Sequence, residues 1–290
     1  MNKTYEKICI GTANFGQEYG FNKNLQLSKS EVFSILSLAR DNNIKTIDTA
    51  ANYGKSEKLI GDFGNDEWNI ITKIPAISNS VDIKSDISNY IQNSLEELRQ
   101  DKLYGLLIHN INDMYSEKFF KIFEEISKKK SEKLVSKIGV SLYSPDDIKY
   151  VKDFDIDLVQ IPLNIFDRRF IETGSLKELY RKNIEIHARS IFLQGNLLKN
   201  FPDLPNYFLQ WKELWANWHA WLDNRKLTPL KVCLNFAISF KEINKIILGI
   251  DSKNHLIEII ENLGDNHHTK YPDISSTDEF LVNPMKWKLN

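Results

Sequence analysis

Eight short apolar runs, each followed by a longer segment with helical periodicity, recur along the whole chain. Most of these runs are rich in Ile, Leu and Val at successive positions, which is typical of strands in a parallel sheet that is covered on both faces. Strands that alternate with helices through right-handed crossovers close most simply into a (β/α)8 TIM barrel. The predicted strands are KICIGT (7–12), KTIDTA (45–50), NIITKI (69–74), LYGLLIH (103–109), KIGVSL (137–142), LVQIPL (158–163), EIHARSI (185–191) and KIILGI (245–250).

Between the strands, the expected helices begin at recognisable capping residues. Ser28 and Glu31 have the spacing of a capping box, in which each side chain accepts a hydrogen bond from the backbone of the other residue. Ser144 and Thr228 each precede a proline, which favours a helix with proline at its first position. No linker interrupts the pattern, and 290 residues are within the size range of one barrel, so we expect an α/β fold with a single domain over residues 1–290.

A tryptophan-rich stretch at 206–224 holds four of the six tryptophans. Such a density can indicate a surface on which ligands stack. The apolar residues of this stretch nevertheless recur at helical spacing, which favours one additional helix packed onto the barrel. They are Phe208, Trp211, Leu214, Trp215, Trp218 and Trp221.

Charge and cysteine content narrow the class of protein. The 38 Lys and Arg residues nearly balance the 39 Asp and Glu residues, which gives no electrostatic argument for nucleic acid or an anionic membrane as partner and favours a small-molecule ligand. Cys9 and Cys233 have neither a CxxC neighbour nor a histidine at ligand spacing, so we expect two buried, reduced thiols and no metal site. The absence of a signal peptide, and of any apolar run of the ~20 residues that a membrane span needs, predicts a cytoplasmic protein.

Four polar residues end successive predicted strands or follow them closely. Asp48 and Tyr53 lie at the end of the second strand and on the loop after it, Lys73 near the end of the third strand, and His109 at the end of the fourth. Each has a structural alternative: a turn-capping carboxylate, a packed surface aromatic residue, a snorkelling lysine and a core histidine. Because the strand ends of a barrel share the rim where active sites lie, we expect the four side chains to form one site.

These residue types suit the reduction of a carbonyl group. A phenol has an unperturbed pKa of roughly 10, so it is a useful acid at neutral pH only if a nearby cation stabilises its phenolate. Lys73 is placed to be that cation, and Asp48 is placed to hold the lysine protonated. His109 can then donate a hydrogen bond to the carbonyl oxygen, while the oxygen gains a proton and the carbon a hydride. A lyase with Lys73 as Schiff-base nucleophile is an alternative, but it needs a neutral amine, which Asp48 disfavours.

The string TIDTAANYGKSEKLIG (46–61) resembles the signature of the aldo-keto reductases. The resemblance implies a barrel that binds an extended nicotinamide dinucleotide without a Rossmann domain. It also implies that Asp48, Tyr53, Lys73 and His109 are the catalytic tetrad, with Tyr53 as general acid in reduction. The agreement keeps its order through essentially the whole chain, in ITKI (71–74), LLIHN (106–110), IGVSLY (138–143), VQIPLN (159–164), ARSIFLQGNLL (188–198) and LVNPMKW (281–287).

The residues that resemble the family's nicotinamide site match it in part. Ser141 and Gln160 match the polar residues that hold the nicotinamide carboxamide. Arg189 stands where many members stack an aromatic residue on the nicotinamide ring. Its guanidinium can stack there, face the cofactor pyrophosphate or an anionic substrate, or form a salt bridge at the rim.

The segment after the eighth strand resembles the family's adenosine site with substitutions. His255 replaces a common arginine, and Ile259 replaces a common asparagine. Asp251 would repel an adenosine 2′-phosphate, whereas Lys253 would attract one. Family habit slightly favours NADP(H), with NAD(H) as the alternative. The residues that match in position are Gly249, Ser252, His255 and Glu258.

The loops, including GTANFGQEYG (11–20), resemble those of bacterial members associated with surface-polysaccharide and sugar biosynthesis. This resemblance implies a sugar or nucleotide-sugar carbonyl as substrate. Asn14, Phe15 and Tyr19 would line the mouth of the site or, alternatively, only close the barrel rim. A regulatory subunit that binds the dinucleotide but turns over little is the other function left open.

Overall fold

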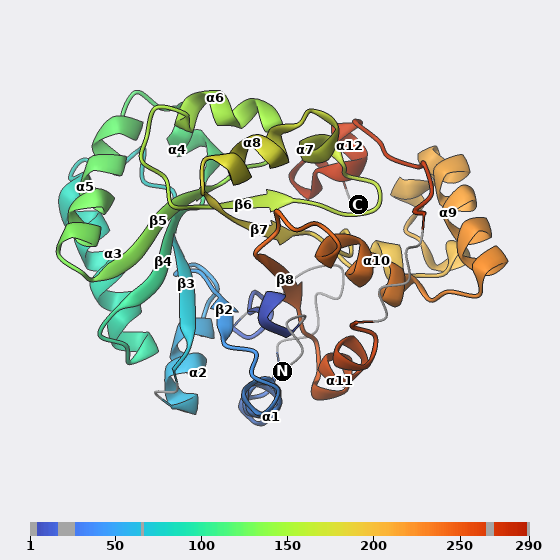
Figure 1. Ribbon diagram of the computed structural model, residues 1–290. Coiled ribbons are helices and arrows are strands. Elements are labelled where there is room, and N and C mark those ends of the chain that lie inside the picture. The colour runs from blue at the N-terminus through green and yellow to red at the C-terminus, as the bar shows by residue number, and fades with distance from the viewer. Residues whose placement is uncertain (1–4, 17–26, 65–66, 265–269, 289–290) are drawn as a thin grey trace.

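The computed structural model describes residues 5–16, 27–64, 67–264 and 270–288. Within them, eight parallel strands close into a barrel in which each strand pairs with the next and β8 pairs with β1. Figure 1 shows these strands surrounded by helices. The predicted (β/α)8 barrel is therefore confirmed, and every predicted strand run contains a strand or overlaps one. The strands are β1 (Ile8–Gly11), β2 (Thr46–Asp48), β3 (Asn69–Ile74), β4 (Leu103–Ile108), β5 (Val135–Ser141), β6 (Leu158–Pro162), β7 (Glu185–Arg189) and β8 (Lys245–Gly249).

Helices connect consecutive strands and cover the outside of the barrel. Their apolar faces pack onto one large hydrophobic cluster that lies between the strands and the helices. The helices are α1 (Lys29–Asp41), α2 (Ser56–Phe63), α3 (Ile83–Leu98), α4 (Ile111–Tyr115), α5 (Phe119–Ser131), α6 (Ile148–Val151), α7 (Arg169–Glu172), α8 (Ser175–Arg181), α9 (Lys212–Arg225), α10 (Pro229–Ile238), α11 (Lys253–Glu261) and α12 (Glu279–Val282).

The predicted capping residues begin their helices, with one correction. Oγ of Ser28 accepts a hydrogen bond of 3.2 Å from the backbone N–H of Glu31, and Thr228 caps α10 in the same way. The second half of the predicted capping box is wrong, because Oε1 of Glu31 instead accepts a hydrogen bond of 2.6 Å from the backbone N–H of Lys253 on α11. Ser144 caps a short 3-10 turn that leads into α6.

The tryptophan-rich stretch packs against the barrel, as its spacing predicts, although it is not a single α-helix. It begins with a 3-10 segment (Asn206–Trp211) and continues as α9, which Figure 1 shows beside the barrel. Phe208, Trp215 and Trp218 are fully buried. Trp221 is half-buried and stacks on Trp218 with an interplanar angle of 10°. The stretch therefore serves the core and not a ligand surface.

The interior of the barrel is packed with side chains. Ile71, Leu107 and Leu158 are fully buried and form an apolar cluster within it. Cys9 on β1 and Cys233 on α10 are both buried free thiols, in agreement with the sequence prediction. Because the middle of the barrel is filled, a ligand site can form only at an end of the barrel.

A polar cluster lies toward the amino-terminal ends of the strands, opposite the predicted active site. Oε1 of Glu185 lies 2.6 Å from Nε2 of His187, and Oε2 accepts hydrogen bonds from Tyr104 and Lys137. Burial acts to raise the pKa of Glu185, but His187, Lys137 and Tyr104 together outweigh it and hold that pKa at about 2. The cluster joins β4, β5 and β7, so it stabilises the barrel away from the site.

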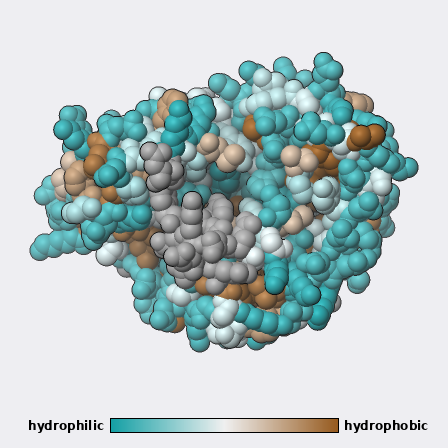
Figure 2. Space-filling view, turned by 180° about the vertical axis from the view of Figure 1, so that it is seen from behind, coloured by the Kyte–Doolittle hydropathy of each residue, from teal (hydrophilic) through white to brown (hydrophobic). Residues whose placement is uncertain are grey.

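Hydrophilic residues predominate on the face shown in Figure 2, where hydrophobic residues lie in small separate groups. The most exposed large hydrophobic side chains, Val81, Phe120 and Met285, belong to different parts of the chain.

None of the helices that the structure describes is long and apolar enough to cross a membrane. That residues 1–290 form one domain stays a prediction.

Candidate active site

A buried ion pair joins β2 to β3 at the carboxyl ends of these strands. Nζ of Lys73 lies 2.6 Å from Oδ2 of Asp48 and donates a hydrogen bond of 2.8 Å to the carbonyl oxygen of Thr49. The two side chains are only 3% and 6% exposed. The other oxygen of Asp48 accepts a hydrogen bond from Nε2 of Gln160. Since a buried charge persists only when it is paired and hydrogen-bonded, this arrangement holds Lys73 as an ammonium ion.

Buried hydroxyl groups fix the loop that leads from β2 into α2. Oγ of Ser56 donates to Oγ1 of Thr12 at 2.7 Å and lies 3.1 Å from Oγ1 of Thr49. Oγ1 of Thr12 donates in turn to the carbonyl oxygen of Asp48 at 3.0 Å. The backbone N–H of Ser56 donates to the carbonyl oxygen of Tyr53 at 3.1 Å. Sequence reasoning assigned no role to Thr12 or Ser56, although both lie in the quoted motifs. They hold the loop that carries Tyr53.

Tyr53 and His109 lie beside the ion pair. Nζ of Lys73 is 5.2 Å from the centroid of the Tyr53 ring. The ring centroids of Tyr53 and His109 are 6.1 Å apart, with the rings at 83°. Both rings are partly exposed, whereas Asp48 and Lys73 are buried beneath them. The four residues that the sequence placed on one rim therefore lie together.

The environment of His109 favours a neutral imidazole. Burial, aided by the positive charges of Lys73 and Arg189 and opposed by the charge of Asp48, lowers the pKa of His109 from 6.5 to about 4. A neutral imidazole carries one N–H donor and one acceptor. At neutral pH, His109 can thus donate a hydrogen bond to a ligand oxygen without adding a second cation next to Lys73.

This lowered pKa predicts a pH dependence of stability. Below about pH 6.5 the unfolded chain protonates His109, whereas the folded chain resists protonation until about pH 4, so the free energy of unfolding falls as the pH falls through this window. Between about pH 7 and pH 5 the loss due to His109 is about 2 kcal/mol. Urea unfolding of the wild type and of His109→Gln at both pH values measures it. Equal pH dependence in the two proteins would contradict the prediction.

Ser141 and Gln160 are register partners on β5 and β6, and both are nearly fully buried. Oγ of Ser141 is buried with no hydrogen-bond partner among the residues that the structure describes. Nε2 of Gln160, in contrast, donates to Asp48 on β2 across the barrel. Of the two predicted carboxamide contacts, Ser141 therefore has a free polar atom, while Gln160 also supports the ion pair.

Arg189, the last residue of β7, extends toward the end of β5. Its Cζ lies 4.4 Å from the centroid of the Tyr143 ring, and its Nη2 donates a hydrogen bond of 3.0 Å to the carbonyl oxygen of Leu142. Among the described residues, no carboxylate lies within ion-pairing distance of its guanidinium, so the salt-bridge alternative has no partner there. Tyr143 had no predicted role, although it belongs to the quoted motif IGVSLY.

The start of α11 holds the predicted adenosine-side residues. Oγ of Ser252 caps the helix by accepting from the backbone N–H of His255 at 3.0 Å, and Nδ1 of His255 accepts from the backbone N–H of Asp251 at 3.3 Å. The backbone N–H of Lys253 donates to Glu31 of α1. A helix N-terminus is a favourable place for an anion, and here a carboxylate of the protein takes one of its N–H groups. No local signal could reveal this contact, because it joins residues 222 positions apart.

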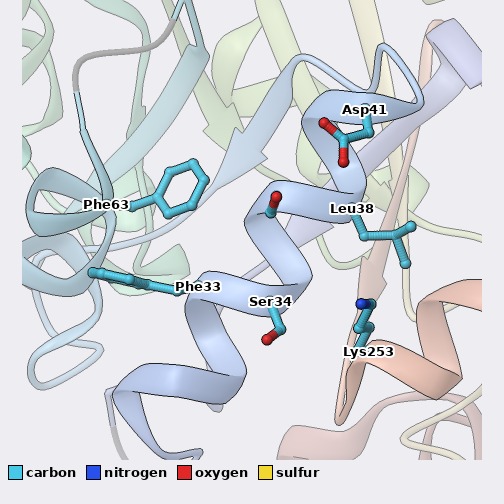
Figure 3. Close-up of a pocket in the computed structure, with 7 residues that line it drawn as sticks. Phe33, Ser34, Leu38, Asp41, Phe63 and Lys253 are labelled. Carbon is cyan, nitrogen blue, oxygen red and sulfur yellow. The ribbon is translucent and has the colours of Figure 1, made fainter.

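Gly249, Glu258 and the side chain of Lys253 lie at more open positions. A Cβ atom added to Gly249 would meet nothing within 4 Å, so there is space beside the end of β8. Glu258 is exposed on α11. Lys253 borders a groove of about 390 Å³ along α1, where Figure 3 shows its side chain near Leu38. The groove belongs to the helical layer, and the other residues that line it are Phe33, Ser34, Ser37, Asp41 and Phe63.

The predicted mouth residues close the rim. Nδ2 of Asn14 donates to the carbonyl oxygen of Ile250 at 2.8 Å and to Oδ1 of Asp251 at 2.9 Å, which ties the loop after β1 to the loop after β8. Phe15 is fully buried in the core. Both placements favour the rim-closing alternative over substrate contact. Tyr19 lies outside the described residues.

Comparisons with known proteins agree with this geometry. Two solved structures from Pseudomonas aeruginosa, both described as candidate aldo-keto reductases, resemble the fold. The first has a TM-score of 0.66 at 20% identity, and its alignment covers 88% of this chain and 88% of its own. The second has a TM-score of 0.65 at 18% identity and covers 89% of this chain and 90% of its own. Among curated proteins, none matches. The model of the aldo/keto reductase family matches residues 7–274, which include all eight strands and the whole candidate site, and the chain therefore belongs to the aldo/keto reductase family.

Proposed function

We propose that this protein reduces an aldehyde or ketone with a reduced nicotinamide dinucleotide, and that Tyr53 donates the proton. Family membership makes the chain a carbonyl oxidoreductase. The observation that carries the finer proposal is the buried Asp48–Lys73 ion pair, whose Nζ lies 5.2 Å from the centroid of the Tyr53 ring. An ammonium ion at this place favours the phenolate that forms when Tyr53 gives up its proton.

Each member of the site has a distinct role in the proposal. Tyr53 protonates the carbonyl oxygen as the carbon accepts a hydride, which the reduced nicotinamide supplies when bound. His109, neutral because of its lowered pKa, donates a hydrogen bond to the same oxygen and orients it. Asp48 acts through Lys73, since it holds the ammonium group in place, and Gln160 acts through Asp48, to which it donates a hydrogen bond.

The contacts of Lys73 oppose the Schiff-base lyase. A Schiff base requires a neutral, accessible amine. Nζ of Lys73 is instead hydrogen-bonded to Asp48 and to Thr49, and its side chain is 3% exposed. The ammonium form that these contacts stabilise suits proton transfer at Tyr53.

The interior of the site fits a nicotinamide carboxamide. An unpartnered buried hydroxyl costs about 1–3 kcal/mol unless a ligand completes its hydrogen bonds, and Oγ of Ser141 is such a group. We propose that it binds the carboxamide. Nε2 of Gln160 already donates to Asp48, which leaves Oε1 of Gln160 to accept a hydrogen bond from the carboxamide NH2. The open space at Gly249 lets a dinucleotide pass close to the backbone.

The contacts at the start of α11 disfavour NADP(H), the cofactor that family habit favours. Glu31 accepts the hydrogen bond from the Lys253 N–H that a 2′-phosphate could accept there, and its charge would repel that phosphate. We therefore propose that Glu31 disfavours NADPH relative to NADH. In Glu31→Gln, the Kd for NADPH relative to that for NADH should fall about fivefold, which corresponds to ~1 kcal/mol at a helix terminus.

Fluorescence titration of the purified protein with both dinucleotides measures this ratio. Glu261→Gln is the matched control, because it makes the same charge change on an exposed residue at the far end of α11. The control should leave the ratio unchanged. An unchanged ratio in Glu31→Gln would show that Glu31 does not select the cofactor.

The carbonyl substrate is proposed to be a sugar or nucleotide sugar, on the strength of the loop resemblance. The test of the whole proposal combines two measurements: binding of NADH and NADPH, followed by their oxidation with a panel of simple aldehydes, ketones and sugars. Binding with carbonyl-dependent oxidation supports the reductase. Binding without any oxidation favours a dinucleotide-binding regulatory subunit, and absence of binding would contradict the proposed cofactor site.

A further inference from the structure

We propose that Arg189 binds an anionic group, a carboxylate or a phosphate, that the carbonyl substrate itself carries. The enzyme would then prefer anionic aldehydes or ketones to neutral ones of the same shape. This inference rests on the proposed carbonyl reduction and adds a chemical class to its substrate.

Arg189 lies on the inner side of the barrel at its mouth. Gln160 of β6 points inward, because it reaches Asp48 on β2. In register, Gln160 pairs with His187 and Pro162 pairs with Arg189. Since alternate residues of a strand face the same side, His187 and Arg189 also point inward, and Arg189 is at the carboxyl end of β7. Arg189 is close enough to His109 for its positive charge to help lower the pKa of that imidazole.

The charge of Arg189 has no protein counter-ion in the part of the chain that the structure describes. Asp167 is the carboxylate that could act as a counter-ion of Arg189, since the charge of Arg189 acts on it. However, Nε and Nη2 of Arg169 donate to the two oxygens of Asp167 at 2.8 Å each. Arg189 itself donates to Leu142 and, at 3.4 Å, to Oγ of Ser190. Its Nε has no partner among the described residues. A half-buried guanidinium with a free N–H and no counter-ion is well suited to a ligand oxyanion.

The guanidinium is also held in a fixed orientation. Stacking on Tyr143 and the hydrogen bond to Leu142 restrict its rotation. The loop that follows is strained, since Ser190, Leu193 and Gln194 have positive φ values of 61°, 48° and 55°. Such conformations cost non-glycine residues of order 1 kcal/mol each and tend to occur where a ligand site requires them. A preorganised cation loses little entropy when it binds an anion, which makes it selective.

The test compares two aldehydes of nearly equal shape, 4-formylbenzoate and 4-formylbenzamide, which differ in charge. Their Kd values are measured by calorimetry on the protein saturated with oxidised dinucleotide, a state in which no reduction occurs. We expect the wild type to bind the carboxylate about 30-fold more tightly than the amide, as charge-assisted hydrogen bonds do. Arg189→Met should abolish that ratio, and Arg189→Lys should restore part of it.

Arg168→Met is the matched control, since Arg168 also lies over an aromatic ring, that of Phe236, and donates to a carbonyl oxygen. It should leave the ratio unchanged. An equal ratio in the wild type and Arg189→Met, or no measurable binding of 4-formylbenzoate, overturns the proposal. Loss of affinity for ADP-ribose in Arg189→Met, with the ratio unchanged, would instead assign Arg189 to the cofactor pyrophosphate. If the charge preference holds but neither aldehyde is reduced with reduced dinucleotide, the reductase fails and the anion site stands.

Discussion

In Tyr53→Phe, kcat for carbonyl reduction is expected to fall about 10²- to 10⁴-fold, because a positioned general acid contributes a factor of this size. The substitution removes only the phenol oxygen. The ring that lies beside Lys73 and His109 remains, so the fold and the Kd of the dinucleotide should be unchanged. Steady-state kinetics and fluorescence titration separate the two effects.

Tyr53 is a cleaner target than Lys73. Removing the lysine would leave the Asp48 carboxylate buried without its counter-ion, which typically destabilises a protein by about 3–5 kcal/mol. A low activity of a Lys73 variant would thus mix chemistry with unfolding. Tyr150→Phe is the matched control, since Tyr150 is an exposed tyrosine on α6, and it should keep full activity. Wild-type kcat in Tyr53→Phe would rule out Tyr53 as the proton donor.

Trp215→Ala is expected to cause a large loss of stability. Trp215 is fully buried in α9, edge-on to Phe166 at 4.8 Å and to Phe208 at 5.9 Å between ring centroids. Removing a buried tryptophan costs the burial of its apolar surface and leaves a cavity, together about 3–5 kcal/mol. Its indole N–H has no partner among the described residues, so no hydrogen bond is lost with it.

Urea unfolding followed by circular dichroism measures this loss, with Trp221→Ala as the comparison. Trp221 is only half-buried, between the Trp218 ring and the guanidinium of Arg225, so its loss should cost well under half as much. If Trp215→Ala were as stable as the wild type, the burial of Trp215 would not stabilise the fold. That result would revive the ligand-stacking alternative for this stretch.

The sequence was most informative where local pattern and fold geometry coincide. Apolar runs identify the strands, and the rule that active sites lie at strand ends then predicts that Asp48, Lys73 and His109 lie together. The tryptophan spacing likewise predicts buried packing, although the break between the 3-10 segment and α9 has no clear sequence signal.

Contacts between distant elements could not be predicted in this way. Glu31 has the spacing of a capping-box acid, and only the packing of α1 against α11 brings it to Lys253 instead. Gln160 likewise reaches Asp48 across the barrel, at a separation of 112 residues. Both contacts depend on the dimensions of the closed barrel, which a single sequence does not record.

The contacts of Asn14 and Glu31 also bear on the order in which the protein can be made. Asn14 binds Ile250 and Asp251, and Glu31 binds Lys253, so the first and last parts of the ring meet only after about 250 residues have left the ribosome. Until then β1 lacks its partner β8 and presents an unpaired edge to other nascent chains. Closure of the barrel is therefore a late step of synthesis, because it needs the last strand as well as the first.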